Sequence, residues 1–145
     1  MSVLRVIEVN AASGAYEVVI GRDALSARAD RLANRAPRGR VVIVADSHAL
    51  KHHETRLAQA FDAANLKIEL IEIEGGESAK SWRGLEALCD RLLDLNVERS
   101  EPVIAFGGGT VGDLTGFASA VLKRGTRFIQ IPTTLLAQVD SSVGG

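Results

Sequence analysis

A glycine-rich stretch stands between a short apolar run and a segment with one apolar face. Residues 107–113 read GGGTVGD, in which Gly107, Gly109 and Gly112 form G-x-G-x-x-G. The run at 103–106 (VIAF) predicts a buried strand, and the apolar residues after the glycines recur at helical spacing. In that context, glycines let the backbone approach a pyrophosphate, whose charge is met by free N–H groups and the helix dipole. We predict a nucleotide or phosphate site here; the alternative is a glycine-rich turn without a ligand.

An acidic residue for a ribose is missing from its usual place. In the dinucleotide-binding motif this acid ends the next strand, about 20 residues after the glycines, where the chain has Pro132-Thr133-Thr134. Asp46 is the candidate instead, because it follows the apolar strand predicted at 41–45, at the end where open α/β sheets bind ligands. The alternative is that Asp46 caps the helix that begins near Ser47.

A second polar loop, residues 75–80 (GGESAK), also follows a predicted strand and precedes a predicted helix. Glu77 and Lys80 either pair with each other on the surface or present an acceptor and a cation to a nucleotide. Their spacing alone is compatible with both interpretations.

A third polar stretch, residues 132–142, is dense in hydroxyl groups and contains the carboxylate of Asp140. Thr133 and Thr134 either cap the next helix or join the other polar groups. Because the carboxyl ends of parallel strands share one edge of a sheet, we expect these loops to line a common crevice.

Basic residues carry weaker signals. Arg124 is expected to end the helix that begins near Thr110, where it interacts with the helix dipole or binds an anion, for instance in a neighbouring subunit. Arg35, Arg38 and Arg40 surround a Pro and a Gly without interleaved aromatic residues, which predicts a solvated turn rather than a nucleic-acid site.

Histidines and the single tryptophan are assigned structural roles. His48 and His52 have i, i+4 spacing and His53 adjoins them, but no acid or cysteine stands at metal-ligand spacing, so a solvated helix face is predicted. We predict no metal ligand in the chain. Trp82 opens a predicted helix and is expected to pack against the core.

The order of apolar runs predicts the elements that hold these residues. Strand-like and helix-like patterns alternate, which is typical of βαβ units in a layered α/β domain. We predict one Rossmann-like α/β domain with a mainly parallel sheet and an N-terminal antiparallel strand pair. The predicted strands are 3–9, 15–20, 41–45, 67–73, 103–106 and 128–131.

Composition excludes several classes of function. The chain has 145 residues, of which 46% are hydrophobic and 24% charged, with a net charge of -1. This indicates one folded soluble domain without a general attraction for nucleic acid or a membrane. Cys89 is the only cysteine and cannot form an internal disulfide, so we expect the cytoplasm. The loop-like ending at 141–145 leads us to expect a piece of a longer protein.

Three motifs together resemble one known family. They are GGESAKS at 75–81, GGGTVGDLTGF at 107–117 and RGTRFIQIPTTLLAQVDSSVGG at 124–145. In this order they resemble the 3-dehydroquinate synthases of the shikimate pathway, and the resemblance runs over the whole chain. It implies that residues 1–145 are the N-terminal NAD-binding domain, whereas the family's helical C-terminal domain, with its zinc or cobalt ion, is absent here.

Site residues follow from the same resemblance. It implies that Asp140 lies near the nicotinamide and substrate as a catalytic residue, and that Arg124 reaches the substrate site of the partner subunit in a homodimer. The cofactor-binding residues that it implies are Asp46, Gly75, Gly76, Glu77, Ser78, Ala79, Lys80, Gly108, Gly109, Thr110, Val111, Gly112, Asp113, Thr133, Thr134, Leu136, Asp140 and Ser141.

The reaction implied is the conversion of 3-deoxy-D-arabino-heptulosonate 7-phosphate into 3-dehydroquinate and phosphate, with NAD regenerated and a divalent metal as Lewis acid. In the family, the metal ligands come after the Gly-Gly that matches Gly144 and Gly145 of this chain, so we expect this chain alone to be inactive. The alternatives are a domain of a related sugar-phosphate cyclase or polyol dehydrogenase, and a non-catalytic nucleotide-binding module.

Overall fold

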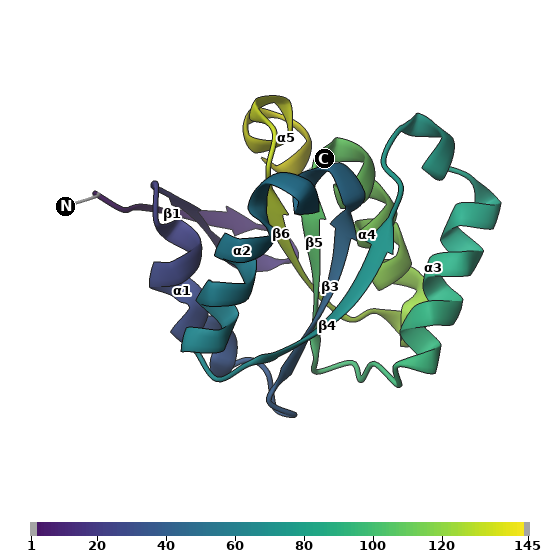
Figure 1. Cartoon of the computed structure of the whole chain (residues 1–145), viewed down its shortest axis with the longest axis horizontal. Coiled ribbons are helices and arrows are strands. Elements are labelled where there is room, and N and C mark those ends of the chain that lie inside the picture. The colour runs from purple at the N-terminus through teal and green to yellow at the C-terminus, as the bar shows by residue number, and fades with distance from the viewer. Residues whose placement is uncertain (1–2, 144–145) are drawn as a thin grey trace.

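A computed structural model describes residues 3–143 (Figure 1). Gly144 and Gly145, which close the third family motif, lie outside the described residues. The strands are β1 (Arg5–Ala11), β2 (Gly14–Ile20), β3 (Arg40–Asp46), β4 (Lys67–Ile73), β5 (Pro102–Gly107) and β6 (Arg127–Pro132). The helices are α1 (Ala24–Ala33), α2 (Ser47–Ala63), α3 (Trp82–Asp94), α4 (Gly109–Val121) and α5 (Leu135–Val139), with 3-10 turns η1 (Glu77–Ala79), η2 (Leu122–Arg124) and η3 (Ser141–Val143).

Four strands form the central sheet in the order β4-β3-β5-β6, all parallel. β3 and β5 are buried along nearly their whole length because helices cover both faces of the sheet. Val41, Ile43 and Ala45 pack with α2 in one core, while Val42 and Val44 pack with α3 and α4 in the other. The predicted fold class is confirmed.

The chain reverses its direction across the sheet between β3 and β5. From β3 it crosses through α2 to β4, and from β5 it crosses through α4 to β6, on the other side. Figure 1 shows α2 and α4 on opposite faces of the sheet. Such a switch point leaves a crevice beyond the carboxyl ends of the two central strands, here at Asp46 and Gly107.

The predicted N-terminal strand pair is a separate two-stranded sheet. β1 and β2 pair antiparallel from Arg5↔Ile20 to Ala11↔Gly14, and none of their residues is buried. Contacts from the pair to the rest of the described chain include the ion pair between Glu17 and Arg31 of α1, and the Tyr16 hydroxyl, which donates to the Val143 carbonyl at 3.3 Å.

A buried ion-pair network closes the opposite end of the sheet. Glu101, only 1% exposed, accepts hydrogen bonds from Arg40 Nε at 2.8 Å and from Arg38 at 3.2 Å. The Glu98 backbone N–H donates to the same carboxylate at 2.8 Å, and Arg40 also donates to the Leu95 carbonyl at the end of α3, at 2.7 Å. The predicted solvated turn holds for Arg35 and Arg38, which are exposed in turn positions, but it is wrong for Arg40, which opens β3 and whose side chain is only 13% exposed.

One further difference from prediction concerns the start of α3. Trp82 is 81% exposed at the start of α3 and does not pack against the core.

None of the helices among the described residues combines the length and apolar character needed to cross a membrane.

Candidate functional site

Loops from all four strands of the central sheet line one cleft of about 620 Å³ at the carboxyl edge. Asp46 follows β3, Gly75 and Gly76 follow β4, residues 108–110 follow β5, and Thr133 and Thr134 follow β6. The common crevice predicted from the sequence is therefore present. The remaining lining residues are Ser47, His48, Ala49, His52, His53, Glu74 and Val111.

Asp46 both caps α2 and lines the cleft, the two positions that the sequence left open for it. Its Oδ1 caps α2 by accepting hydrogen bonds from the backbone N–H groups of His48 (2.8 Å) and Ala49 (3.0 Å). Its Oδ2 faces Gly75 so closely that a Cβ there would overlap it. One carboxylate oxygen thus holds the helix, and the other lies at the mouth of the cleft.

Gly107 brings β5 close to Asp46. A Cβ at this buried position would lie 2.8 Å from the Asp46 Cβ and 3.3 Å from the Val111 Cβ, and its φ of +156° is one that side chains rarely adopt. The Gly107 carbonyl also accepts a hydrogen bond from Thr133 N at 2.9 Å. Only glycine lets three strand ends meet at this point.

The N-terminus of α4 is an open donor site. Asp46, Ser81 and Thr134 cap α2, α3 and α5 with side-chain oxygens, but Gly108 at the cap position of α4 has no side chain to do so. The glycine loop and the first residues of α4 line the cleft. Free N–H groups and the helix dipole there attract an anion.

The GGESAK loop is tied to α4 by its charged groups. Lys80 Nζ lies 2.7 Å from Asp113 Oδ2 and 3.4 Å from Glu77 Oε1, and the Thr110 hydroxyl donates to Glu77 Oε1 at 3.1 Å. The hydrogen bond with Asp113 raises the pKa of Lys80, which keeps the amine charged. Glu77 and Lys80 do pair with each other, and the same pairing holds η1 over the glycine loop.

The other residues implied by the resemblance lie around this network or the glycine loop. Ser78 and Ala79 complete η1, and Val111 is buried in α4. Gly112 donates its N–H to the Gly108 carbonyl at 3.1 Å. None of these side chains donates or accepts a side-chain hydrogen bond among those described, so any role in binding belongs to their backbone and shape.

The segment after β6 approaches the cleft from the other side. The Thr134 hydroxyl accepts from Ala137 N at 3.1 Å and so caps the short helix α5, which is one of the two roles that the sequence left open for it. Leu136 is 70% exposed, and Asp140 is exposed at the end of α5. A Cβ at Gly109 would lie 3.1 Å from the Ser141 Oγ, so this segment touches the glycine loop.

Arg124 does not lie at the cleft of its own chain. α4 ends at Val121 rather than at Arg124, and Lys123 and Arg124 both have positive φ values, +47° and +64°. Arg124 precedes β6, whereas Thr133 follows it, so the two lie at opposite ends of the sheet. The expectation that Arg124 ends this helix is wrong, and any ligand of Arg124 must lie outside this cleft.

The histidines were missed as cleft residues. His48, His52 and His53 all line the cleft, although the sequence predicted a solvated helix face. For His48 the available signal was its position two residues after Asp46. Within residues 3–143, no group of three or more His, Cys, Asp or Glu side chains is arranged to hold a metal ion.

Comparison with known proteins adds the family to this geometry. The model of the 3-dehydroquinate synthase N-terminal family matches residues 70–145, just over half of the chain. The chain belongs to this family. Its relatives include the 3-dehydroquinate synthase of Caulobacter vibrioides, 50% identical over 143 residues, and that of Rhodopseudomonas palustris, 45% identical over 139 residues.

The 3-dehydroquinate synthase relatives are much longer than this chain. The match covers 98% of the chain but 39% of the Caulobacter protein, and 96% of the chain but 36% of the Rhodopseudomonas protein. The chain therefore spans less than two fifths of the length of the curated relatives that it matches.

Solved structures of related synthases share the fold. A 2-deoxy-scyllo-inosose synthase, crystallised with carbaglucose-6-phosphate, NAD+ and Co2+, superimposes with a TM-score of 0.81 at 24% identity, over 97% of this chain and 38% of its own. ValA, a 2-epi-5-epi-valiolone synthase from Streptomyces hygroscopicus subsp. jinggangensis with NAD+ and Zn2+ bound, gives 0.68 at 31% identity, over 70% of this chain and 29% of its own.

Proposed function

We propose that residues 1–145 are the N-terminal NAD-binding domain of a 3-dehydroquinate synthase. The complete enzyme would convert 3-deoxy-D-arabino-heptulosonate 7-phosphate into 3-dehydroquinate and phosphate. The names and identities of the curated relatives favour this enzyme over a related cyclase or a polyol dehydrogenase. With a single cysteine, the composition suits the reducing cytoplasm, which is the compartment that we propose.

One observation carries the proposal: the uncapped N-terminus of α4 opens into the cleft at the switch point of the sheet. The cleft is large enough for part of a dinucleotide, and glycines let the backbone reach its pyrophosphate. The residues present therefore fit NAD. ValA, which is 31% identical over the matched part, holds NAD+ in its crystal structure and supports the same assignment.

The chain's own residues would bind and orient the cofactor. The backbone N–H groups of residues 109–111 would meet the pyrophosphate, and Asp46 Oδ2 would accept the ribose hydroxyls. Glu77 and Thr110, already hydrogen-bonded to each other, would position the loop over the phosphates. When bound, NAD supplies a hydride acceptor and then a hydride donor.

The nicotinamide end is proposed to lie along the segment after β6. Thr133, Thr134 and Ser141 contact the glycine loop from that side. On the same segment, Leu136 and the exposed Asp140 carboxylate would lie near the nicotinamide and the substrate. Because Arg124 lies at the far end of the sheet, its proposed partner is the substrate site of another subunit in a homodimer.

A divalent metal is part of the proposed whole enzyme. The described residues offer no set of ligands for it, so we derive no step through the metal here. The zinc in the ValA structure supports a metal for the complete protein only.

Calorimetric titration of the purified chain with NAD+ and with ATP tests the proposal. We expect NAD+ to bind and ATP to bind at least tenfold more weakly, since ATP has no second nucleoside to reach the segment after β6. Glu77→Ala and Asp113→Ala should each weaken NAD+ binding by about tenfold, because each frees one tether of the loop.

Glu86→Ala is the matched control, since it removes an exposed carboxylate from α3 outside the cleft. It should leave the affinity for NAD+ unchanged. Equal affinity for ATP and NAD+ would instead favour the general nucleotide-binding module, and absence of NAD+ binding would refute the proposed function.

A further inference from the structure

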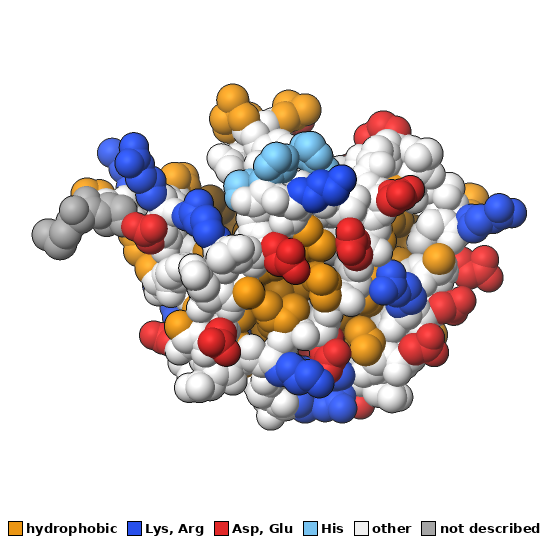
Figure 2. Space-filling view, viewed as in Figure 1, with side chains coloured by type: hydrophobic (Ala, Val, Ile, Leu, Met, Phe, Trp, Pro, Cys, Tyr) orange, Lys and Arg blue, Asp and Glu red, His pale blue; other side chains and the backbone are white. Residues whose placement is uncertain are grey.

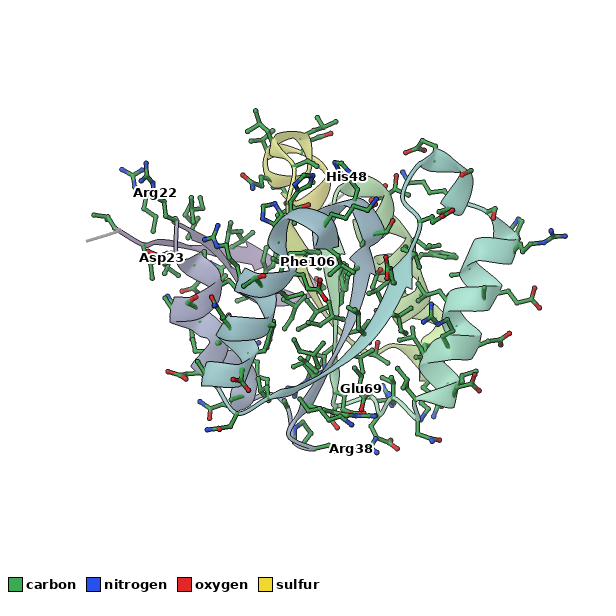
Figure 3. The ribbon with its side chains drawn as sticks, viewed as in Figure 1. Arg22, Asp23, Arg38, His48, Glu69 and Phe106 are labelled. Atoms are coloured by element: carbon green, nitrogen blue, oxygen red, sulfur yellow. The ribbon has the colours of Figure 1, made fainter. Side chains whose placement is uncertain are left out.

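Three histidines form one wall of the cleft. The rings of His48 and His52 meet edge to face with centroids 4.9 Å apart, His52 and His53 follow at 6.3 Å, and His53 contacts the Phe106 ring at 6.4 Å. Figure 2 shows them gathered on one side of the molecule below the apolar side chains of α5. Figure 3 places His48 above Phe106 at the cleft end of the sheet. We call these three residues the histidine wall.

The histidine wall begins two residues after the acid proposed to bind the ribose. Asp46 Oδ1 is held by the backbone N–H of His48, so the His48 residue is fixed beside that carboxylate. An acid in this position normally rejects a ribose 2′-phosphate by repulsion, whereas a cation near it accommodates one. In this chain the nearby groups are imidazoles, whose class changes charge between about pH 5 and 8.

Charges around the wall are few. Among the residues that line the cleft, the only other titratable groups are Asp46 from β3 and Glu74 from the end of β4. The residues that line the cleft from α4 and from the segment after β6 are uncharged. α2 packs against α1. The charged residues near the wall on α2 and on the loop before α1 are Arg22, Asp23, Lys51, Glu54 and Arg56.

Protonation of the wall and binding of a phosphate favour each other. The rings of His48 and His52, with centroids 4.9 Å apart, are close enough for one phosphate to lie beside both. A phosphate dianion in that place attracts a proton on either ring. By linkage, a ligand that carries such a phosphate binds more tightly as the pH falls.

We propose that His48 and His52 make the choice between NAD and a 2′-phosphorylated dinucleotide dependent on pH. This inference rests on the proposed NAD site. At alkaline pH, Asp46 and Glu74 dominate and the 2′-phosphate is rejected. Toward pH 6.5, protons on the wall offset the two carboxylates, and the discrimination against NADP+ shrinks.

The test is a calorimetric comparison of NAD+ and NADP+ at pH 8.5 and pH 6.5 on the 145-residue chain. For the unchanged chain, the Kd for NADP+ divided by the Kd for NAD+ should fall about tenfold from pH 8.5 to pH 6.5. A change of this size corresponds to one favourable charge interaction at close range. Binding of NADP+ at pH 6.5 should also take up protons, measured by repeating the titration in buffers of different ionisation enthalpy.

Two variants separate the effect of the histidines from that of the Asp46 carboxylate. In the double variant H48N/H52N the ratio should change less than twofold with pH, and the proton uptake should disappear. Asp46→Asn keeps a side chain that can cap α2; it should lower the ratio at both pH values and keep the pH dependence. His48 and His52 are exposed, so the double variant is expected to fold, and circular dichroism checks the fold of both variants.

Each failure has its own meaning. If NAD+ binds but the ratio does not change with pH, or changes equally in H48N/H52N, the inference is wrong and the proposed function stands. If NAD+ does not bind at pH 8.5, the proposed function is wrong and the inference falls with it.

Discussion

Replacing Gly107 with alanine should destabilise the domain by about 2–4 kcal/mol and weaken NAD+ binding at least tenfold. The new Cβ would lie 2.8 Å from the Asp46 Cβ and 3.3 Å from that of Val111, at a φ of +156°. Both neighbours must move, and one of them is the proposed ribose acceptor. Urea unfolding measures the stability, and calorimetry measures the affinity.

Gly39→Ala is the matched control for Gly107→Ala. Gly39 also has a positive φ, +65°, but a Cβ there meets nothing within 4 Å, and the residue lies at the opposite end of the sheet. The Gly39→Ala variant should lose about 1 kcal/mol of folding stability and keep its affinity for NAD+. If Gly107→Ala loses no more stability and no more affinity than this control, the close packing of β5 against Asp46 does not hold the site together.

Removing the charge of Glu101 should produce a loss of similar size at the other end of the sheet. Glu101→Gln leaves Arg40, whose side chain is only 13% exposed, without its anionic partner, and we expect a loss of about 3 kcal/mol at pH 7. Glu98→Gln changes an exposed carboxylate 3.9 Å from Lys123 and should stay within about 0.5 kcal/mol of the unchanged chain.

The same pair gives the sign of the pH dependence. Burial raises the pKa of Glu101, but the hydrogen bonds from Arg40 and from the Glu98 backbone outweigh it and hold the pKa below its ordinary value. Its stabilising effect is thus complete above the pKa of the unfolded chain, about 4.3, and is lost as the pH falls through the lower folded value. Unfolding measured at pH 7, 5, 4 and 3 should show the gap between the unchanged chain and Glu101→Gln closing in acid; a constant gap would contradict this account.

The position of the cleft followed from the sequence because the fold rule behind it is general. Apolar runs without alternation identify strands that are covered on both faces, and polar residues directly after such strands gather at one edge of a parallel sheet. Asp46, Gly75 and Thr133 were placed this way. For Asp46 the two interpretations were not exclusive, since a carboxylate has two oxygens and the structure uses one for each role.

Other features depend on tertiary packing that the sequence pattern does not contain. The direction in which the first turns of α2 face is set by packing against β3 and β5, so His52 and His53 could not be assigned to the cleft. Glu101 sits in a polar loop sequence, NVERSE, which gives no sign that its carboxylate is buried by Arg38 and Arg40. Arg124 was expected at a helix end, and two left-handed residues remove it from there.

The antiparallel strand pair divides the molecule into two parts of different cooperativity. Because no residue of β1 or β2 is buried, few contacts would be lost if the pair opened while the four-stranded sheet stayed folded. Amide hydrogens of β1 and β2 should then exchange with solvent through a local opening, whereas those of β3 and β5 wait for global unfolding. Opening of the strand pair should therefore leave intact the cleft at Asp46 and Gly107, which is built on the two strands expected to exchange most slowly.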